Sequence, residues 1–202
     1  MRSCEYSTTS EKNPRTKRLR VRNIQFYNSR GHRIKKKKKF HRAHRVTITF
    51  ENQKNGEKME TITRTQGRKN SQFKPVKIWA DIVTRILSYE DTGPDTFVNV
   101  VCVDGKLREI TASMIGLKIK ACVDKIGIKR LGFTRHDVGT HSIRTSFASM
   151  LSFQQVDTKH IMLQGRWKSN SVFRYIRTDI MAPEKITRAL QDAQNFNIIK
   201  LK

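Results

Sequence analysis

The stretch THSIRTSFASML, residues 140–151, places a histidine and an arginine three positions apart, at His141 and Arg144. Its apolar spacing predicts a helix over about 140–153. The expected core-facing stripe of this helix consists of Ile143, Phe147 and Met150. Side chains three apart on a helix are neighbours, so we expect His141 and Arg144 together on the face turned away from that stripe. Such a pair suits recognition of a phosphate, because a guanidinium offers a planar fork of donors.

The stretch QGRWKSNSVFRYIR, residues 164–177, carries a glycine, a tryptophan and a tyrosine in order. Gly165 is followed by Trp167 two residues later and by Tyr175 ten residues later. Taken separately, each of the two aromatic residues also fits an ordinary packing role, because large aromatic side chains are commonly buried. The order of these residues after the HxxR motif makes the pattern specific.

These motifs closely resemble those of the tyrosine recombinase family, which includes the phage integrases. Members carry HxxR, then a glycine followed by His or Trp, and then a nucleophilic Tyr. The resemblance covers roughly residues 1–178 and is most specific over 140–178. It implies a mixed α+β, mainly α catalytic core, with a small antiparallel β-sheet or hairpin near the N-terminal side. One departure is Arg166, which stands directly after the glycine, so we expect Trp167 to take the His/Trp role through a small shift of the turn.

The resemblance also points to two catalytic positions upstream. The family's first arginine lies in an Arg-x-x-Glu pattern, which the sequence RSCE at residues 2–5 matches. Its active-site lysine lies on a β-hairpin, which indicates Lys54 in QKNGEK, or Lys58 if the turn register differs. The resemblance therefore implies six catalytic residues, namely Arg2, Lys54, His141, Arg144, Trp167 and Tyr175.

The chemistry implied by the resemblance is cleavage of a DNA phosphodiester, whose negative oxygens repel a nucleophile. Two arginines, Arg2 and Arg144, would clamp the non-bridging oxygens, since a guanidinium stays charged at neutral pH. His141 and Trp167 would add hydrogen bonds to the same phosphate. These four groups would stabilise the charge of the transition state.

The remaining two residues would move the proton and form the new bond. Lys54 would protonate the departing 5′ oxygen, and Tyr175 would attack to form a 3′-phosphotyrosyl bond. A free tyrosine has a pKa near ~10, so a neighbouring acceptor and a cationic field must assist it. The bond that forms preserves a phosphoester, so rejoining needs no ATP. We expect no cofactor and no metal, because the sequence has no P-loop pattern, carboxylate cluster or His/Cys site.

The charge of the chain indicates a polyanionic partner. It has 42 Lys+Arg against 17 Asp+Glu, a formal net charge of +25. Nucleic acid is the first candidate, and an anionic membrane surface or an acidic protein is also a possible partner.

The positive charge is concentrated in one segment. From Lys12 to Phe50 there are 15 Lys/Arg and no acidic residue, which predicts a basic loop at about 12–45 that lies along nucleic acid or is disordered. A nuclear-import signal has the same composition. The expected DNA-contacting residues are Lys35, Lys36, Lys37, Lys38, Lys39, Arg166 and Lys168.

Local patterns predict the elements that surround these residues. In VTITFE, from Val46, apolar and polar residues alternate as in a half-buried strand, and Asn55-Gly56 suits a type I′ turn before a return strand over about 57–64. Pro75 opens a helix whose expected buried face consists of Val76, Trp79, Val83 and Ile86. Residues 97–103 read as extended.

Further helices are expected along the second half of the chain. Thr111 or Ser113 would cap one that ends at Gly127. Another is expected over about 156–164, and the last would start at Pro183. The resulting division is one catalytic domain over 1–180 and a C-terminal helix or tail over 181–202.

Several classes of protein are disfavoured by the sequence. No run of about 18 apolar residues is available to span a bilayer, and the first ten residues lack the apolar core of a secretory signal. Three cysteines without CxxC spacing disfavour a disulfide scaffold and a cysteine zinc site. We therefore expect an intracellular protein, nuclear in a eukaryote and otherwise cytoplasmic.

Three functions stay open at this point. The first is a tyrosine recombinase that breaks and rejoins double-stranded DNA, with several protomers, typically four, assembled on the DNA. The family's N-terminal DNA-gripping domain is not in these 202 residues, so we expect an N-terminally truncated catalytic domain. The second is a DNA-binding remnant of a mobile element without turnover. The third is a basic RNA-binding protein, which would account for the Lys run but not for the spaced motifs.

Overall fold

The computed structural model describes residues 6, 17–52, 58–67 and 74–176. Within these residues the protein is mixed α+β and contains a four-stranded antiparallel sheet and a separate two-stranded hairpin. Contacts divide the chain into two compact units, an N-terminal unit over 1–140 and a C-terminal unit over 141–202. The sequence predicted a single domain over 1–180, whereas the contacts separate it after Thr140.

The four-stranded sheet is built on the predicted hairpin. Strand β3 (Arg45–Asn52) pairs antiparallel with β4 (Lys58–Thr65), and the alternating apolar residues of β3 are buried as expected. These inward residues are Val46, Ile48 and Phe50. The strands of the hairpin are thus confirmed, while the Asn55-Gly56 turn lies outside the described residues.

The basic segment before this hairpin is folded, so the prediction of a loop at about 12–45 was wrong for residues 20–45. It forms a 3₁₀ turn η1 (Val21–Asn23), strands β1 (Ile24–Tyr27) and β2 (Arg33–Ile34), and a second 3₁₀ helix η2 (Lys37–Arg42). The sheet order is β2-β1-β3-β4.

The physical reason is the set of apolar side chains that lie between the cations. Val21, Ile24, Phe26 and Phe40 are all buried. The rings of Phe26 and Phe40 stack with centroids 4.5 Å apart, which ties η2 to β1. Burial of these side chains stabilises the segment enough to overcome the repulsion among its cations, which remain at the surface.

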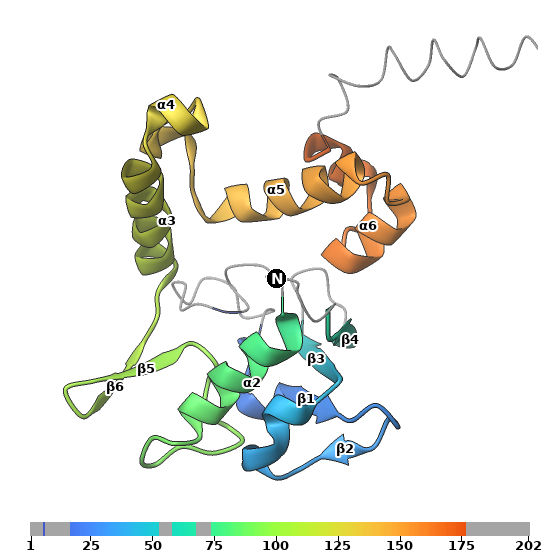
Figure 1. Cartoon of the computed structure of the whole chain (residues 1–202), viewed down its shortest axis with the longest axis vertical. Helices are drawn as coiled ribbons and strands as arrows, with labels where there is room; N and C mark the ends of the chain where they lie inside the picture. The colour runs from blue at the N-terminus through green and yellow to red at the C-terminus, as the bar shows by residue number, and fades with distance from the viewer. Residues whose placement is uncertain (1–5, 7–16, 53–57, 68–73, 177–202) are drawn as a thin grey trace, which may run out of the picture. The chain divides into compact units, whose positions relative to one another are not determined.

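Helix α2 (Pro75–Ile86) lies against the sheet, as Figure 1 shows. Proline occupies its first turn, where a missing N–H costs nothing. The four predicted core residues of the helix are buried, together with Ala80. This prediction is confirmed, and the core of the N-terminal unit lies between α2 and one face of the sheet.

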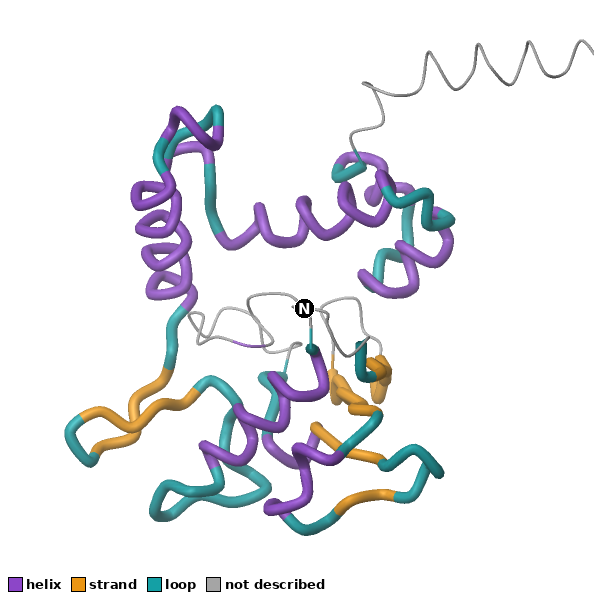
Figure 2. Tube along the Cα trace, in the orientation of Figure 1, coloured by secondary structure: helices purple, strands orange, loops and turns teal. Residues whose placement is uncertain are grey.

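The rest of the N-terminal unit is a hairpin followed by helices. Strands β5 (Val100–Val103) and β6 (Lys106–Glu109) form a two-stranded sheet, apart from the four-stranded one in Figure 2. Helix α3 (Ala112–Ile126) begins where the Thr111 hydroxyl accepts a hydrogen bond from the Met114 N–H, and ends at Gly127, as predicted. The short helices α4 (Ile128–Leu131) and η3 (Arg135–Asp137) follow.

The described part of the C-terminal unit contains helices and loops only (Figure 2). Its elements are α5 (Thr140–Phe153), α6 (Thr158–Gly165) and the 3₁₀ helix η4 (Asn170–Arg174). Helix α6 begins two residues later than expected because the Asp157 carboxylate caps the N–H groups of Lys159 and His160. The helix predicted from Pro183 lies outside the described residues. In the described part of the chain, no helix combines the length and the apolar character needed to cross a bilayer.

The predicted core stripe of α5 was wrong for Ile143 and Met150, while its third member, Phe147, is half-buried. Ile143 is 57% exposed and Met150 is 55% exposed, whereas Ala148 is fully buried. Leu151 packs against the same cluster as Ala148. The packed face of α5 is therefore the one that also carries Arg144, four residues before Ala148, so the prediction that Arg144 lies on the face turned away from the core was wrong.

Candidate phosphate-binding site

The hydroxyl of Tyr175 and the imidazole of His141 are in hydrogen-bond contact. His141 Nε2 lies 2.9 Å from Tyr175 Oη, although the residues are 34 positions apart in the chain. Tyr175 follows the last residue of η4 and is half-buried, and His141 is exposed in the first turn of α5. The Ser149 hydroxyl donates to the Tyr175 carbonyl at 2.7 Å, which fixes η4 against α5. The tyrosine is thus held by its neighbours, with its hydroxyl at the imidazole.

Arg144 is held in place by the GRW segment. Its Nη2 donates to the Gly165 carbonyl at 2.7 Å, and its guanidinium carbon lies 4.0 Å from the centroid of the Trp167 ring. Stacking on an aromatic face together with a directed hydrogen bond fixes the plane of a guanidinium. A fixed plane is what bidentate recognition of a phosphate requires.

Trp167 connects the other members of the cluster. It is 8% exposed, and its ring centroid lies 5.4 Å from that of Tyr175 at an angle of 46°. The ring also covers Gly165. The indole therefore acts as a packing platform for Arg144 and Tyr175.

Arg166 forms the turn between Gly165 and Trp167. Its φ of 56° is left-handed and ends α6, and the Trp167 N–H then bonds to the Met162 carbonyl at 2.9 Å. This turn brings the indole back over Gly165. Arg166 itself is 5% exposed, so the structure corrects its prediction as a surface contact to DNA. Lys168, by contrast, is exposed.

The local charge favours an anion. In the described part of the C-terminal unit there are five Lys/Arg and one carboxylate, Asp157. That carboxylate accepts a hydrogen bond from the Lys159 N–H at the start of α6. His141 and Arg144 therefore lie in a unit with a cationic surplus, and we name His141, Arg144, Trp167 and Tyr175 the tyrosine cluster.

The structure does not bring the two predicted upstream residues into the tyrosine cluster. Arg2 and Lys54 lie outside the described residues. The alternative lysine, Lys58, is the first residue of β4, is exposed, and stands opposite Asn52 in the sheet register.

The five lysines of the run are exposed and carried on or beside η2. Lys37 Nζ donates to the Leu87 carbonyl at 3.0 Å. Lys37, Lys38, His41 and Arg85 line a cavity of about 480 Å³. The run is therefore presented by a folded element, which the charge pattern alone did not predict.

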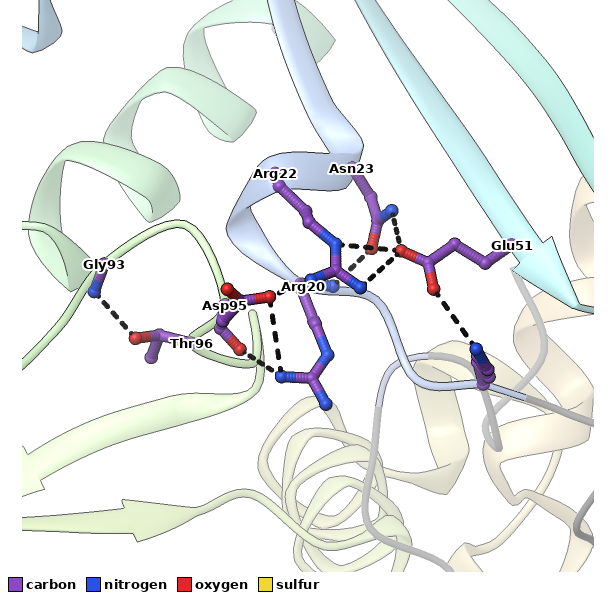
Figure 3. Close-up of polar contacts among 8 residues, drawn as sticks. Arg20, Arg22, Asn23, Glu51, Gly93, Asp95 and Thr96 are labelled. Carbon is purple, nitrogen blue, oxygen red and sulfur yellow. Dashed lines mark hydrogen bonds and ion pairs between the residues drawn. The ribbon is translucent and has the colours of Figure 1, made fainter.

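Other cations of the basic segment are neutralised within the N-terminal unit, a feature that sequence reasoning missed. Arg22 bridges Asp95 and Glu51, and Arg20 Nη1 donates to the Asp95 carbonyl at 2.6 Å (Figure 3). A hydrogen bond from the Asn23 amide, with Arg22 beside it, holds the pKa of Glu51 below its ordinary value. The basic segment contains no acidic residue, and its partners, Glu51 and Asp95, lie later in the sequence. The composition of the segment therefore gave no sign of this pairing.

In the described ranges, no group of three or more His, Cys, Asp and Glu side chains is placed to hold a metal ion. The cysteines that the structure describes, Cys102 and Cys122, are free and exposed.

No protein-family model matches this sequence, and comparisons with curated proteins and with solved structures found no similar protein.

Proposed function

We propose that the tyrosine cluster binds a phosphodiester of double-stranded DNA and that Tyr175 attacks it, so that the protein breaks and rejoins DNA strands. The observation that carries this proposal is the 2.9 Å contact between Tyr175 Oη and His141 Nε2, beside the stacked guanidinium of Arg144. When the imidazole carries its proton on Nδ1, Nε2 accepts from the tyrosine hydroxyl. A hydroxyl beside such an acceptor and next to a fixed cation is the arrangement that nucleophilic attack on a phosphate needs.

In the cleavage step, one P–O bond forms as another breaks, and the proton of the tyrosine hydroxyl moves to a base. The Tyr175 hydroxyl loses its proton to His141 Nε2, and the oxygen bonds to phosphorus as the P–O5′ bond breaks. Arg144 stabilises the charge on the non-bridging oxygens. The resemblance assigns a second arginine role to Arg2 and the proton for the departing O5′ to Lys54 or Lys58. The DNA is held as a 3′-phosphotyrosine until a 5′ hydroxyl reverses the reaction.

The partners follow from this reaction. The substrate is double-stranded DNA, and exchange between two duplexes requires several copies of the chain on the DNA. The place of action is then the nucleus of a eukaryote, or otherwise the cytoplasm. Lys168 and the Lys35–Lys39 run supply contacts to the backbone, as their exposure allows.

Incubation of the full chain with nicked DNA duplexes tests the proposal, since a nick lets the cleaved fragment diffuse away and traps the adduct. We expect a protein–DNA band that survives denaturation and disappears in Tyr175→Phe. Tyr89→Phe is the matched control, because Tyr89 is a half-buried tyrosine of the N-terminal unit outside the cluster. An adduct that persists in Tyr175→Phe contradicts the assignment.

A second candidate is DNA binding without cleavage. The same hydrogen bond favours it, because a half-buried Tyr175 already paired with His141 can be a purely structural residue. In that case duplex binding depends on Arg144 and the lysines, and no adduct forms on any nicked duplex.

A further inference from the structure

One row of residues crosses all four strands of the sheet in the N-terminal unit. Tyr27 stands opposite Arg33 of β2 on one side and opposite Arg45 of β3 on the other. Arg45 in turn stands opposite Thr65 of β4. An aromatic ring is thus flanked on both sides by an arginine.

Threonines continue this face of the sheet beyond the row. In the neighbouring row Thr47 stands opposite both Gln25 and Thr63. In the row after that, the hydroxyls of Thr49 and Thr61 are 2.9 Å apart. We call these rows together the open face, which consists of Gln25, Tyr27, Arg33, Arg45, Thr47, Thr49, Thr61, Thr63 and Thr65.

The open face is the one that α2 does not cover. Side chains alternate along a strand, so the buried Val46, Ile48 and Phe50 face α2, and their neighbours point to the other side. Arg33 and Arg45 are exposed, and Tyr27 is half-buried. The surface is therefore polar and accessible.

The two arginines of the row are available to a ligand. The guanidinium groups of Arg33 and Arg45 make no ion pair, hydrogen bond or ring contact with another described residue. Arg20 and Arg22 are instead tied to Asp95 (Figure 3). On this side of the described strands the one carboxylate is Glu51, at the far end of β3, where Arg22 and Asn23 hold it.

We infer that the open face binds single-stranded DNA, with one base stacked near Tyr27 and with Arg33 and Arg45 on the phosphates to either side. Adjacent strands are about 4.8 Å apart, so the two arginines start about 10 Å from each other across the tyrosine. A sheet face that carries an aromatic side chain between two cations has the chemistry of single-strand recognition, because every base has a stacking face. The threonine hydroxyls add donors and acceptors for the backbone.

The choice of DNA over RNA rests on the proposed function, since breaking and exchanging strands exposes unpaired DNA. The open face lies wholly in the N-terminal unit, so its binding can be measured in Tyr175→Phe protein, where no cleavage by this residue occurs. Loss of the adduct and loss of single-strand binding are therefore separate results.

The test uses the full-length Tyr175→Phe protein and a fluorescently labelled 20-nucleotide oligothymidylate, followed by anisotropy. We expect Tyr27→Ala to weaken binding about tenfold, and Tyr27→Phe to retain it, because the ring rather than the hydroxyl stacks. The double variant Arg33→Ala/Arg45→Ala should weaken binding and flatten the dependence of log K on log salt by about 1.4, or about 0.7 for each phosphate that the variant no longer neutralises.

The matched control is Lys106→Ala/Arg108→Ala on β6, which removes the same charge from an exposed hairpin. Equal weakening by this control pair overturns the inference, because it means that only total charge matters. Unchanged binding in Tyr27→Ala overturns it as well. If Tyr27→Ala does not fold, as thermal unfolding would show, the arginine pair and its control decide the question through the salt dependence. A tenfold preference for oligouridylate over oligothymidylate overturns the assignment to DNA.

Discussion

The ring of Trp167 lies directly over the α-carbon of Gly165, so that a Cβ at position 165 would overlap the indole Cζ3. Only glycine leaves space for this approach. The glycine and the tryptophan of the GRW segment therefore form one packing unit, and the carbonyl of the same glycine accepts the hydrogen bond of Arg144.

Gly165→Ala should destabilise the protein by about 1–3 kcal/mol, because the added methyl group displaces the indole. The measurement is the free energy of unfolding in urea. Gly116→Ala is the control, since Gly116 lies within α3 and a Cβ there meets nothing within 4 Å. It should stabilise the protein by about 0.5–1 kcal/mol, because alanine is the better helix former. Equal effects of the two substitutions would contradict this description of the site.

Arg144→Lys should lower the yield of the covalent adduct about a hundredfold while changing duplex affinity less than about threefold. Lysine keeps the charge, but it cannot stack on Trp167 and offer a planar fork at the same time. The adduct is quantified on a denaturing gel and affinity by anisotropy. Arg174→Lys, at an exposed position of η4, is the control and should leave both quantities unchanged. A proportional loss of both affinity and adduct in Arg144→Lys would instead assign this arginine to general charge attraction.

Phe40→Ala should cost about 3–5 kcal/mol of unfolding free energy, because it removes a buried ring that stacks on Phe26. The same change should release η2 and expose its amides, which hydrogen exchange at residues 37–42 measures. Phe173→Ala is the control, since Phe173 is largely exposed, and it should change the stability by less than about 1 kcal/mol. Unchanged exchange at η2 would show that another contact anchors the lysine run.

Stability should fall in acid partly through Glu51. The folded state holds the pKa of this carboxyl below its unfolded value, through the Asn23 hydrogen bond first and Arg22 beside it. Its contribution is therefore present above the unfolded pKa of glutamate, about 4.3, and is lost as the pH drops through the folded pKa. Unfolding free energies between pH 6 and pH 3 measure this loss, and Glu51→Gln should show a shallower decline. An identical decline in the variant would rule out Glu51 as a source of the acid sensitivity.

Local sequence patterns were sufficient wherever a regular period of apolar residues coincided with a strong end signal. The alternation of Val46, Ile48 and Phe50 with polar residues predicted β3, and the proline at position 75 predicted the start of α2. The Thr111 cap and Gly127 predicted the two ends of α3. These signals act within a few residues and depend little on tertiary packing.

The remaining features depend on contacts between distant residues. The basic segment was predicted as a loop because its cations outnumber its apolar residues, yet Phe26 and Phe40 stack and are buried, and the segment folds onto the hairpin. On α5 the largest apolar side chains suggested the wrong core face. The buried face instead carries Ala148, whose small side chain allows close packing, and Arg144, which donates a hydrogen bond to the Gly165 carbonyl.

In the candidate site too, some features could be predicted from local sequence patterns and others depend on the folded structure. The HxxR spacing and the later tyrosine indicated which residues to compare, and the structure brings His141, Arg144, Trp167 and Tyr175 together in one unit. The burial of Arg166 could not be predicted from its charge, because it follows from the left-handed turn that ends α6.

The most direct test of the proposed reaction is to locate the attachment point of the DNA. The full chain is trapped on a nicked duplex, denatured, digested with nuclease and protease, and the peptides are identified by mass spectrometry. We predict a nucleotide linked through its 3′ phosphate to the peptide that contains Tyr175, with none in His141→Ala or less by at least a hundredfold. A nucleotide on any other residue, or no linked peptide on any nicked duplex while the duplexes still bind, would contradict the assignment of Tyr175 as the nucleophile.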